Sequence, residues 1–201
     1  MRKVLFILSE LDDTDLDWMI RNGAKEIHSR GAVLIREGEP ISVLYVVLEG
    51  TLSVALRALG GKEVAALRSG EVLGELSFLD SRPPSASVTA ATDVTVLSIP
   101  RALLAKKLAD DTAFAARFYR ALAVFLATRL RRTQQRLGYG GETGILDDDV
   151  AHEDEIQPEL LETVGLASAR FDWMLGRLRG APGVEGGSRR PEPGGRGGTA
   201  R

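Results

Sequence analysis

The chain has 201 residues, of which 44% are hydrophobic, 5% aromatic and 27% charged, with a formal net charge of -2 and no cysteine. This balance predicts one soluble globular domain with appendages, and the charge gives the chain as a whole no attraction to nucleic acid or anionic membranes. The lack of cysteine excludes disulfides, thiolate metal sites and cysteine nucleophiles.

The N-terminal residues resemble neither an export signal nor a membrane anchor. The apolar run over 4–8 is too short for a signal peptide and is followed by acidic residues. No apolar stretch approaches the ~20 residues that cross a bilayer, so we expect a cytoplasmic protein. Residues 10–28 have an acidic first turn and apolar residues at roughly helical spacing, which predicts a helix within an N-terminal helical segment, 1–30.

From residue 31 the pattern changes to short apolar runs separated by glycine. The runs are rich in β-branched residues and are interrupted at Gly38, Gly50 and Gly70, which predicts an antiparallel sandwich or barrel of short strands. They read "AVLI", "VLYVVL", "TLSVAL", "EVAAL", "ASVTA" and "VTVLSI".

Helices follow the strands. Pro100 marks the start of a short helix, and a long helix over 112–137 contains neither glycine nor proline. Its apolar face must be covered by the strands or by a second copy of the chain, so we expect a homodimer through 112–137. The residues of this face are Phe114, Phe118, Leu122, Phe125, Leu126, Leu130 and Leu137.

The last part of the chain differs in composition. Residues 138–179 comprise a glycine-rich joint, an acidic linker with eight carboxylates over 147–162, and a C-terminal helix. Residues 180–201 are rich in glycine, proline and arginine and are expected to be disordered. Four arginines lie close together near the end of the predicted long helix, namely Arg129, Arg131, Arg132 and Arg136. Such a cluster can bind either nucleic acid or the acidic linker, and we expect the linker to be the partner.

The segment "GELSFLDS" has the pattern of a phosphate-binding loop. Gly74 permits close approach of the backbone, Glu75 can accept a hydrogen bond from a ribose hydroxyl, and Leu76 and Ser77 begin a short helical turn with free amides. On the returning strand, a hydroxyl and a further amide come from Ser85 and Ala86.

These motifs, in this order and spacing, resemble the cyclic nucleotide-binding domain family, which includes bacterial catabolite activators, protein kinase A regulatory subunits and gated ion channels. The resemblance covers 32–137 and rests on "LIREGEP", "LYVVLEGTLSV", "GEVLGELSFLD", "PSASVTA" and the long helix. It implies a mainly β fold, an eight-stranded antiparallel roll with flanking helices. It also implies a pocket for cyclic AMP or cyclic GMP inside the roll, and a C-terminal helix that acts as lid or dimer contact.

One position departs from the family pattern. The family has an arginine ten residues after the loop glycine, where it pairs with the ligand phosphate, and this chain has Pro84 there. Losing a charge-assisted contact of this kind weakens binding by roughly one to three orders of magnitude. Arg82 is the candidate replacement, although it can equally be a solvated loop residue. Three possibilities stay open: a cyclic nucleotide, another ligand, or an empty pocket in a roll kept as a scaffold.

Other positions carry weaker signals. Thr133, with Gln134, lies where family members contact the base, or simply at a solvated helix end. The two histidines, His28 and His152, lack metal-ligand spacing, and no catalytic constellation can be assembled. We therefore expect neither a metal nor catalysis.

The sequence thus predicts a stand-alone cyclic nucleotide-binding regulatory protein that signals to a protein partner. The first alternative is a non-binding roll that serves as a scaffold. The second is a transcription regulator with a reduced helix-turn-helix at 160–178, where Gly165 would form the turn. Nucleic acid is the less favoured partner, because this segment has few donors for base edges and acidic residues precede it.

Overall fold

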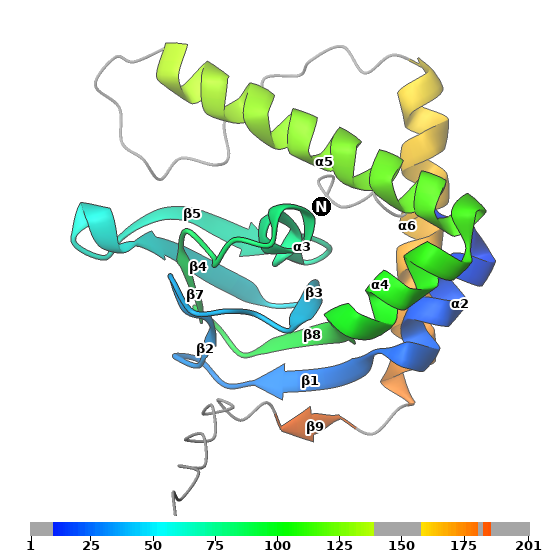
Figure 1. Ribbon diagram of the computed structural model, residues 1–201, viewed down its shortest axis with the longest axis horizontal. Helices are drawn as coiled ribbons and strands as arrows, with labels where there is room; N and C mark the ends of the chain where they lie inside the picture. The colour runs from blue at the N-terminus through cyan, green and yellow to red at the C-terminus, as the bar shows by residue number, and fades with distance from the viewer. Residues whose placement is uncertain (1–9, 139–157, 181–182, 186–201) are drawn as a thin grey trace, which may run out of the picture.

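The computed structural model describes residues 10–138, 158–180 and 183–185 (Figure 1). Eight strands pair in antiparallel fashion in two sheets, which confirms the predicted roll. They are β1 (Ala24–His28), β2 (Val33–Ile35), β3 (Val43–Glu49), β4 (Thr51–Leu56), β5 (Lys62–Arg68), β6 (Val72–Leu73), β7 (Ser87–Ala90) and β8 (Val94–Pro100). A short 3₁₀ turn (Arg57–Leu59) joins β4 to β5.

The sheets are ordered β6-β3-β8-β1-β9 and β2-β7-β4-β5, where β9 (Val184–Glu185) adds to β1 in parallel. The central strand β3 is buried on both faces, which explains why its sequence is an uninterrupted apolar run. Leu44 and Val46 belong to a core cluster shared with the helices, whereas Tyr45 and Val47 belong to a second cluster between the sheets.

The N-terminal segment differs from the predicted helix over 10–28. Helix α2 (Asp13–Asn22) ends at Gly23, and the chain then forms β1, which pairs with β8. The roll therefore begins before the expected boundary between residues 30 and 31.

Strand β1 escapes sequence analysis because its inward groups are polar. Glu26 Oε1 accepts a hydrogen bond from the Ser98 hydroxyl at 2.6 Å, and Glu26 Oε2 lies 3.1 Å from Nε2 of the buried His28. These polar residues satisfy one another, so the strand pairs with β8 without the apolar alternation that would reveal it.

Helices α3 (Glu75–Asp80), α4 (Arg101–Asp110) and α5 (Thr112–Gly138) follow the predicted order, and α4 and α5 have nearly the expected bounds. The chain itself covers the first half of the apolar face of α5, where Phe114 and Phe118 are fully buried. Leu130, in the second half, is 59% exposed. Among the helices described, none combines the length and the apolar character of a membrane span.

The C-terminal helix α6 (Pro158–Arg179) is continuous and lies beside α2 (Figure 1). The helix-turn-helix considered for 160–178 is therefore wrong. Gly165 is exposed within the helix, where glycine costs about 1 kcal/mol but does not force a turn. Ala167 and Met174 are buried in the same core cluster as α2. Residues 147–157 of the acidic linker and the tail after residue 185 lie outside the described residues. The expectation of disorder over the whole of 180–201 is wrong for Val184–Glu185, which form β9.

Gly50 offers a test of the tight connection between β3 and β4. Its φ is +91°, and a Cβ there would lie 2.6 Å from Val94 Cγ1. Gly61 has a similar φ, +80°, with nothing within 4 Å of a Cβ. We expect Gly61→Ala to cost about 1 kcal/mol of unfolding free energy and Gly50→Ala at least about 2 kcal/mol more, measured by urea denaturation. Equal losses in the two variants would contradict the predicted clash.

Candidate functional site

The loop before α3 is held close to strand β3. Gly74 has φ +84° and precedes the first residue of α3. A Cβ at this position would lie 3.1 Å from the Val43 carbonyl oxygen and 3.2 Å from Ile41 Cδ1. Glycine is therefore required twice, for its left-handed backbone and for the close approach of the two segments.

A cavity of about 100 Å³ lies between this loop and the inner face of the β2-β7-β4-β5 sheet. Its apolar lining comes from Ile35, Val54, Leu67, Leu73 and Val88. The rest of the lining comes from the α3 loop, from the segment before β7 and from α5, and consists of Gly74, Glu75, Leu76, Ser77, Pro84, Ser85, Ala86 and Arg129. The cavity is thus apolar on the sheet side and polar on the loop side.

Glu75 is the one carboxylate in this lining, and it is only 4% exposed. Arg129 reaches it from α5, where Nη1 donates a hydrogen bond to Glu75 Oε1 at 2.6 Å. The guanidinium carbon lies 5.8 Å from the centroid of the Phe125 ring, and the side chain is 39% exposed. One helix outside the roll therefore supplies the counter-charge of a carboxylate inside it.

Burial raises the pKa of the Glu75 carboxyl above its usual range, and the attraction of Arg129 opposes this rise without cancelling it. The ionised carboxylate is therefore less favourable here than in water. Carboxylates with shifted pKa values cluster at binding and catalytic sites, although structural ion pairs shift them as well.

The described residues contain no group of three or more histidine, aspartate or glutamate side chains able to hold a metal ion. The polar side chains of the cavity are instead a buried carboxylate, a guanidinium and two serine hydroxyls. This set can bind a small molecule that carries both hydroxyl groups and a negative charge.

Comparison with known proteins identifies the fold and its lineage. Residues 25–111 match the model of the cyclic nucleotide-binding domain. The chain is 30% identical to the N-terminal domain of a transcriptional regulator from Streptomyces coelicolor A3(2), covering 71% of this chain and 100% of that one, with a TM-score of 0.53. The chain belongs to the cyclic nucleotide-binding domain family.

Two further proteins are similar to this chain. The CRP-like cAMP-activated global transcriptional regulator of Mycobacterium tuberculosis is 34% identical over 110 residues, which cover 54% of this chain and 47% of the relative. A cyclic nucleotide-binding domain from Methylobacillus flagellatus shares the fold at a TM-score of 0.63 and 21% identity, covering 71% and 84% of the two chains. The chain thus spans about half the length of the mycobacterial regulator.

The structure brings six of the eight predicted site residues of the domain to the cavity lining, namely Gly74, Glu75, Leu76, Ser77, Ser85 and Ala86. The other two lie elsewhere. Arg82 is 84% exposed, and its Nε lies 3.8 Å from Asp80 Oδ2, outside the lining. Thr133 is exposed, and its hydroxyl donates to the Arg129 carbonyl oxygen of its own helix.

The position of Arg82 follows from its neighbours. Ser81 ends α3 with φ 59°, and two prolines after Arg82 favour an extended backbone. Pro84 itself reaches the cavity, and its carbonyl oxygen accepts a hydrogen bond from Gly38 N at 2.8 Å. At this part of the cavity lining the chain therefore presents the uncharged ring of Pro84, and the charge of Arg82 lies outside the lining.

The sequence favours the acidic linker as the partner of Arg129, whereas the structure places this arginine at the cavity beside Glu75. The available signal was helical spacing, because Arg129 continues the series Phe118, Leu122 and Phe125 at intervals of three and four residues. A charged residue on a buried stripe predicts a buried partner.

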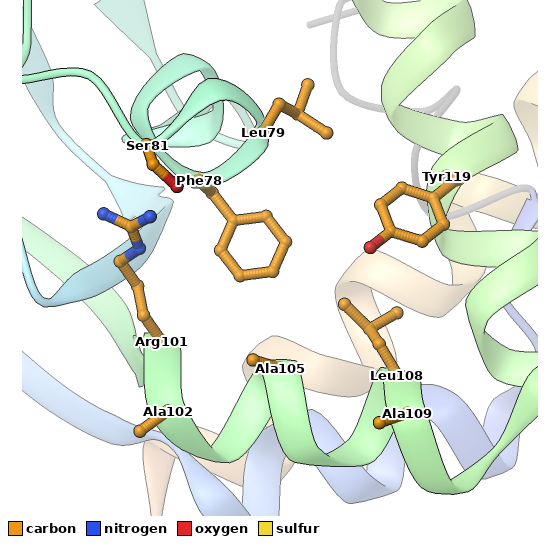
Figure 2. A pocket seen from close by; sticks show the side chains of 9 residues that line it. All are labelled: Phe78, Leu79, Ser81, Arg101, Ala102, Ala105, Leu108, Ala109 and Tyr119. Carbon is orange, nitrogen blue, oxygen red and sulfur yellow. The ribbon is translucent and has the colours of Figure 1, made fainter.

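A larger hollow of about 570 Å³ lies behind α3, between α3, α4 and α5 (Figure 2). Figure 2 shows Phe78 and Leu79 facing Tyr119 across it. Its one charged lining residue is Arg101, whose guanidinium donates to the carbonyl oxygens of Ile41 at 2.9 Å and Ser77 at 2.6 Å. We assign this arginine a structural task, because these bonds tie α3 to α4 and to the loop before β3.

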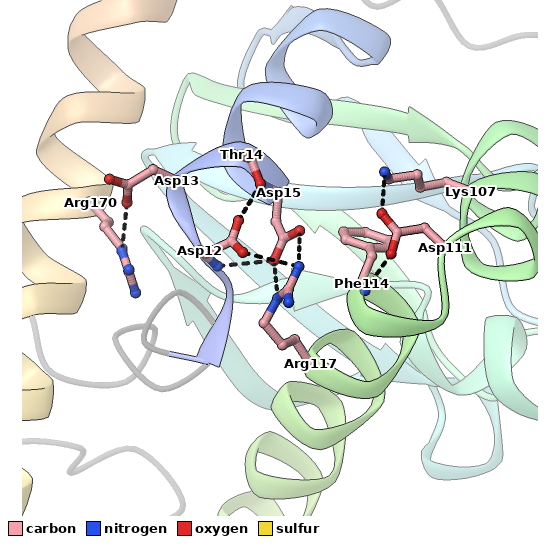
Figure 3. Close-up of polar contacts among 9 residues, drawn as sticks. All are labelled: Asp12, Asp13, Thr14, Asp15, Lys107, Asp111, Phe114, Arg117 and Arg170. Carbon is pink, nitrogen blue, oxygen red and sulfur yellow. Dashed lines mark hydrogen bonds and ion pairs between the residues drawn. The ribbon is translucent and has the colours of Figure 1, made fainter.

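Ion pairs join the helices beside the roll (Figure 3). Arg117 of α5 contacts Asp12 at 3.0 Å and binds Asp15 through two hydrogen bonds, of 2.6 and 2.8 Å. Asp12 and Asp15 form the capping box at the start of α2. The helix that carries Arg129 is therefore fastened to the N-terminus of α2.

Proposed function

We propose that this protein binds a cyclic nucleotide, cyclic AMP or cyclic GMP, in the cavity behind Gly74, and that it acts by binding and not by catalysis. The observation that carries the proposal is Glu75. Its carboxylate is buried in a cavity of a cyclic nucleotide-binding domain and accepts a hydrogen bond from Arg129. A ribose hydroxyl is the natural donor to such a carboxylate, and the apolar lining suits a base.

Signalling in this proposal passes through the helices. A ligand that contacts Glu75 also contacts the partner of Glu75 on α5, so binding biases the position of that helix. Because Arg117 joins α5 to α2, and α6 lies against α2, the same bias reaches the C-terminal helix. The shifted helices would then be recognised by a protein partner, or by a second copy of the chain bound along residues 112–137.

A specific observation favours one alternative, the scaffold. Ligand cavities commonly measure about 300–1,000 Å³, whereas this one measures about 100 Å³. A whole cyclic nucleotide therefore requires that α5 and Arg129 move outward. If they do not, the roll is a scaffold whose cavity is closed by its own arginine.

Isothermal titration separates these two functions. We expect saturable binding of cyclic AMP or cyclic GMP in the micromolar range, and much weaker binding of linear 5′-AMP, whose phosphate carries more charge and is joined to the ribose through one ester bond instead of two. Absence of heat with both cyclic nucleotides at millimolar concentration would favour the scaffold. Equal affinity for the linear nucleotide would contradict a site shaped for a cyclic phosphodiester.

A further inference from the structure

We propose that Arg129 is the cation that binds the ligand's phosphate, so that the charge needed to hold the ligand belongs to α5 and not to the roll. This inference rests on the proposed function and identifies how the same site recognises charge. Arg129 is thereby a specificity-determining residue, and Glu75 is its partner before the ligand arrives.

The charges of the cavity lead to this assignment. Its lining holds one carboxylate, Glu75, and one cation, Arg129. A cyclic phosphodiester brings a further negative charge into a space where Glu75 is already buried. Two like charges in a poorly solvated site repel each other strongly, so a cation must lie within reach of both.

Other arginines near the loop do not meet this need. Arg82 is 84% exposed and lies outside the cavity lining. Arg101 lies behind α3, where its two Nη atoms already donate to carbonyl oxygens. Within the described ranges, Arg129 is the cation that reaches the cavity.

The geometry of Arg129 allows it to hold two acceptors. A guanidinium has five N–H donors in a planar fork, and the bond from Nη1 to Glu75 Oε1 uses one of them. The side chain is 39% exposed, so it can shift toward the cavity mouth at little cost in burial. One edge of the fork can then keep Glu75 while another meets the phosphate.

The opposite role for Arg129 makes the opposite prediction. If Arg129 only closes the empty cavity, a ligand must first break its bond to Glu75, and removal of the arginine strengthens binding. If Arg129 binds the phosphate, its removal weakens binding. The sign of one measured change therefore decides between the two roles.

The experiment titrates the full chain and its variants with cyclic AMP and cyclic GMP. Arg129→Ala is expected to weaken binding at least tenfold and Arg129→Lys less. Arg131→Ala, an exposed neighbour on the same helix, serves as the matched control and is expected to leave affinity unchanged. Thermal unfolding of each variant checks that the fold is retained.

Two further measurements exclude a merely structural effect. Pro84→Arg, which places a guanidinium at the cavity wall, is expected to restore binding in the Arg129→Ala background. The neutral methyl ester of the cyclic nucleotide is expected to bind the unmodified protein at least tenfold more weakly than the charged ligand. The Arg129→Ala substitution is expected to weaken binding of this ester only slightly, because its neutral phosphate makes no charge–charge contact with Arg129 that the substitution could remove.

Each outcome has one meaning. If the unmodified protein binds but Arg129→Ala binds equally or more tightly, the assignment of Arg129 is overturned while the proposed function stands. The assignment is also overturned if the charged and neutral ligands lose the same affinity on substitution. If the unmodified protein binds neither cyclic nucleotide, the proposed function fails and this inference fails with it.

Discussion

Glu75→Gln is expected to make the protein more stable at neutral pH and to weaken ligand binding about 10- to 100-fold. The stabilisation follows from burial, which raises the pKa of Glu75 more than Arg129 lowers it. A glutamine of similar shape has no charge to desolvate, so the substitution removes this penalty and is expected to raise the free energy of unfolding. The lost affinity follows from a charge-assisted hydrogen bond to the ribose, which contributes about 1.5–3 kcal/mol.

The raised pKa of Glu75 determines how the stability gained in Glu75→Gln depends on pH. Because the folded-state pKa of Glu75 lies above the ordinary value of 4.5, the folded protein holds this proton to higher pH than the unfolded chain does. The unmodified protein therefore loses stability as pH rises from 4.5 through the folded-state pKa. Glu75→Gln is expected to be more stable above that window and equal to the unmodified protein below it.

Urea denaturation at pH 4 and pH 7.5, combined with titration calorimetry at pH 7.5, measures both effects. Glu39→Gln is the matched control, because the Glu39 side chain is 64% exposed and is not part of the cavity lining. It is expected to change neither quantity. A Glu75→Gln protein that is less stable at pH 7.5, or that binds the ligand as before, would show that the carboxylate serves the fold and not a ligand.

The destabilising effect of the Glu75 carboxylate can be recognised from the structure but not from the sequence. The sequence suggested Glu75 as a site residue from the loop around it, but it contains no sign that the carboxylate is buried or that its partner lies 54 positions away on α5. Such a pairing depends on the angle at which α5 crosses the roll. That angle is set by packing of Phe114 and Phe118 against α2 and α3.

The fold was more accessible to prediction than the site. Strands such as β3 and β8 are mostly apolar because residues on both of their faces are buried, and glycines with positive φ, such as Gly50 after β3, mark the turns. Strand β1 was missed because Glu26 and the buried His28 are polar and satisfy each other. Local pattern thus indicates strands whose burial is apolar and fails where a polar pair replaces it.

The docking of α6 was only partly visible in the sequence. Its apolar spacing predicted a helix, but its contacts with α2 are ionic as well as apolar. Arg170 Nε lies 3.0 Å from Asp13 Oδ1, and Arg177 Nη2 lies 2.9 Å from Asp17 Oδ1. Lys25 Nζ also donates to the Leu178 carbonyl oxygen at 3.1 Å. Charges this far apart in sequence give no local signal of their pairing.

Arg117→Ala is expected to lower the free energy of unfolding by about 2–3 kcal/mol. The substitution leaves Asp15, which is 2% exposed, without the guanidinium that binds both of its carboxylate oxygens. Breaking a fully buried pair costs about 3–5 kcal/mol, and the cost is expected to fall somewhat below this range because the Arg117 side chain is 33% exposed.

Arg120→Ala, three residues further along α5, is the matched control. Arg120 pairs with Glu10 at 2.9 Å, but its side chain is 73% exposed, so its loss is expected to cost less than about 1 kcal/mol. Because α2 is also the surface on which α6 lies, Arg117→Ala is further expected to speed amide hydrogen exchange in both helices, and Arg120→Ala in neither. Exchange that rises in α2 alone would show that α6 is held by the roll, through Lys25 and β9, and does not follow the movement of α5.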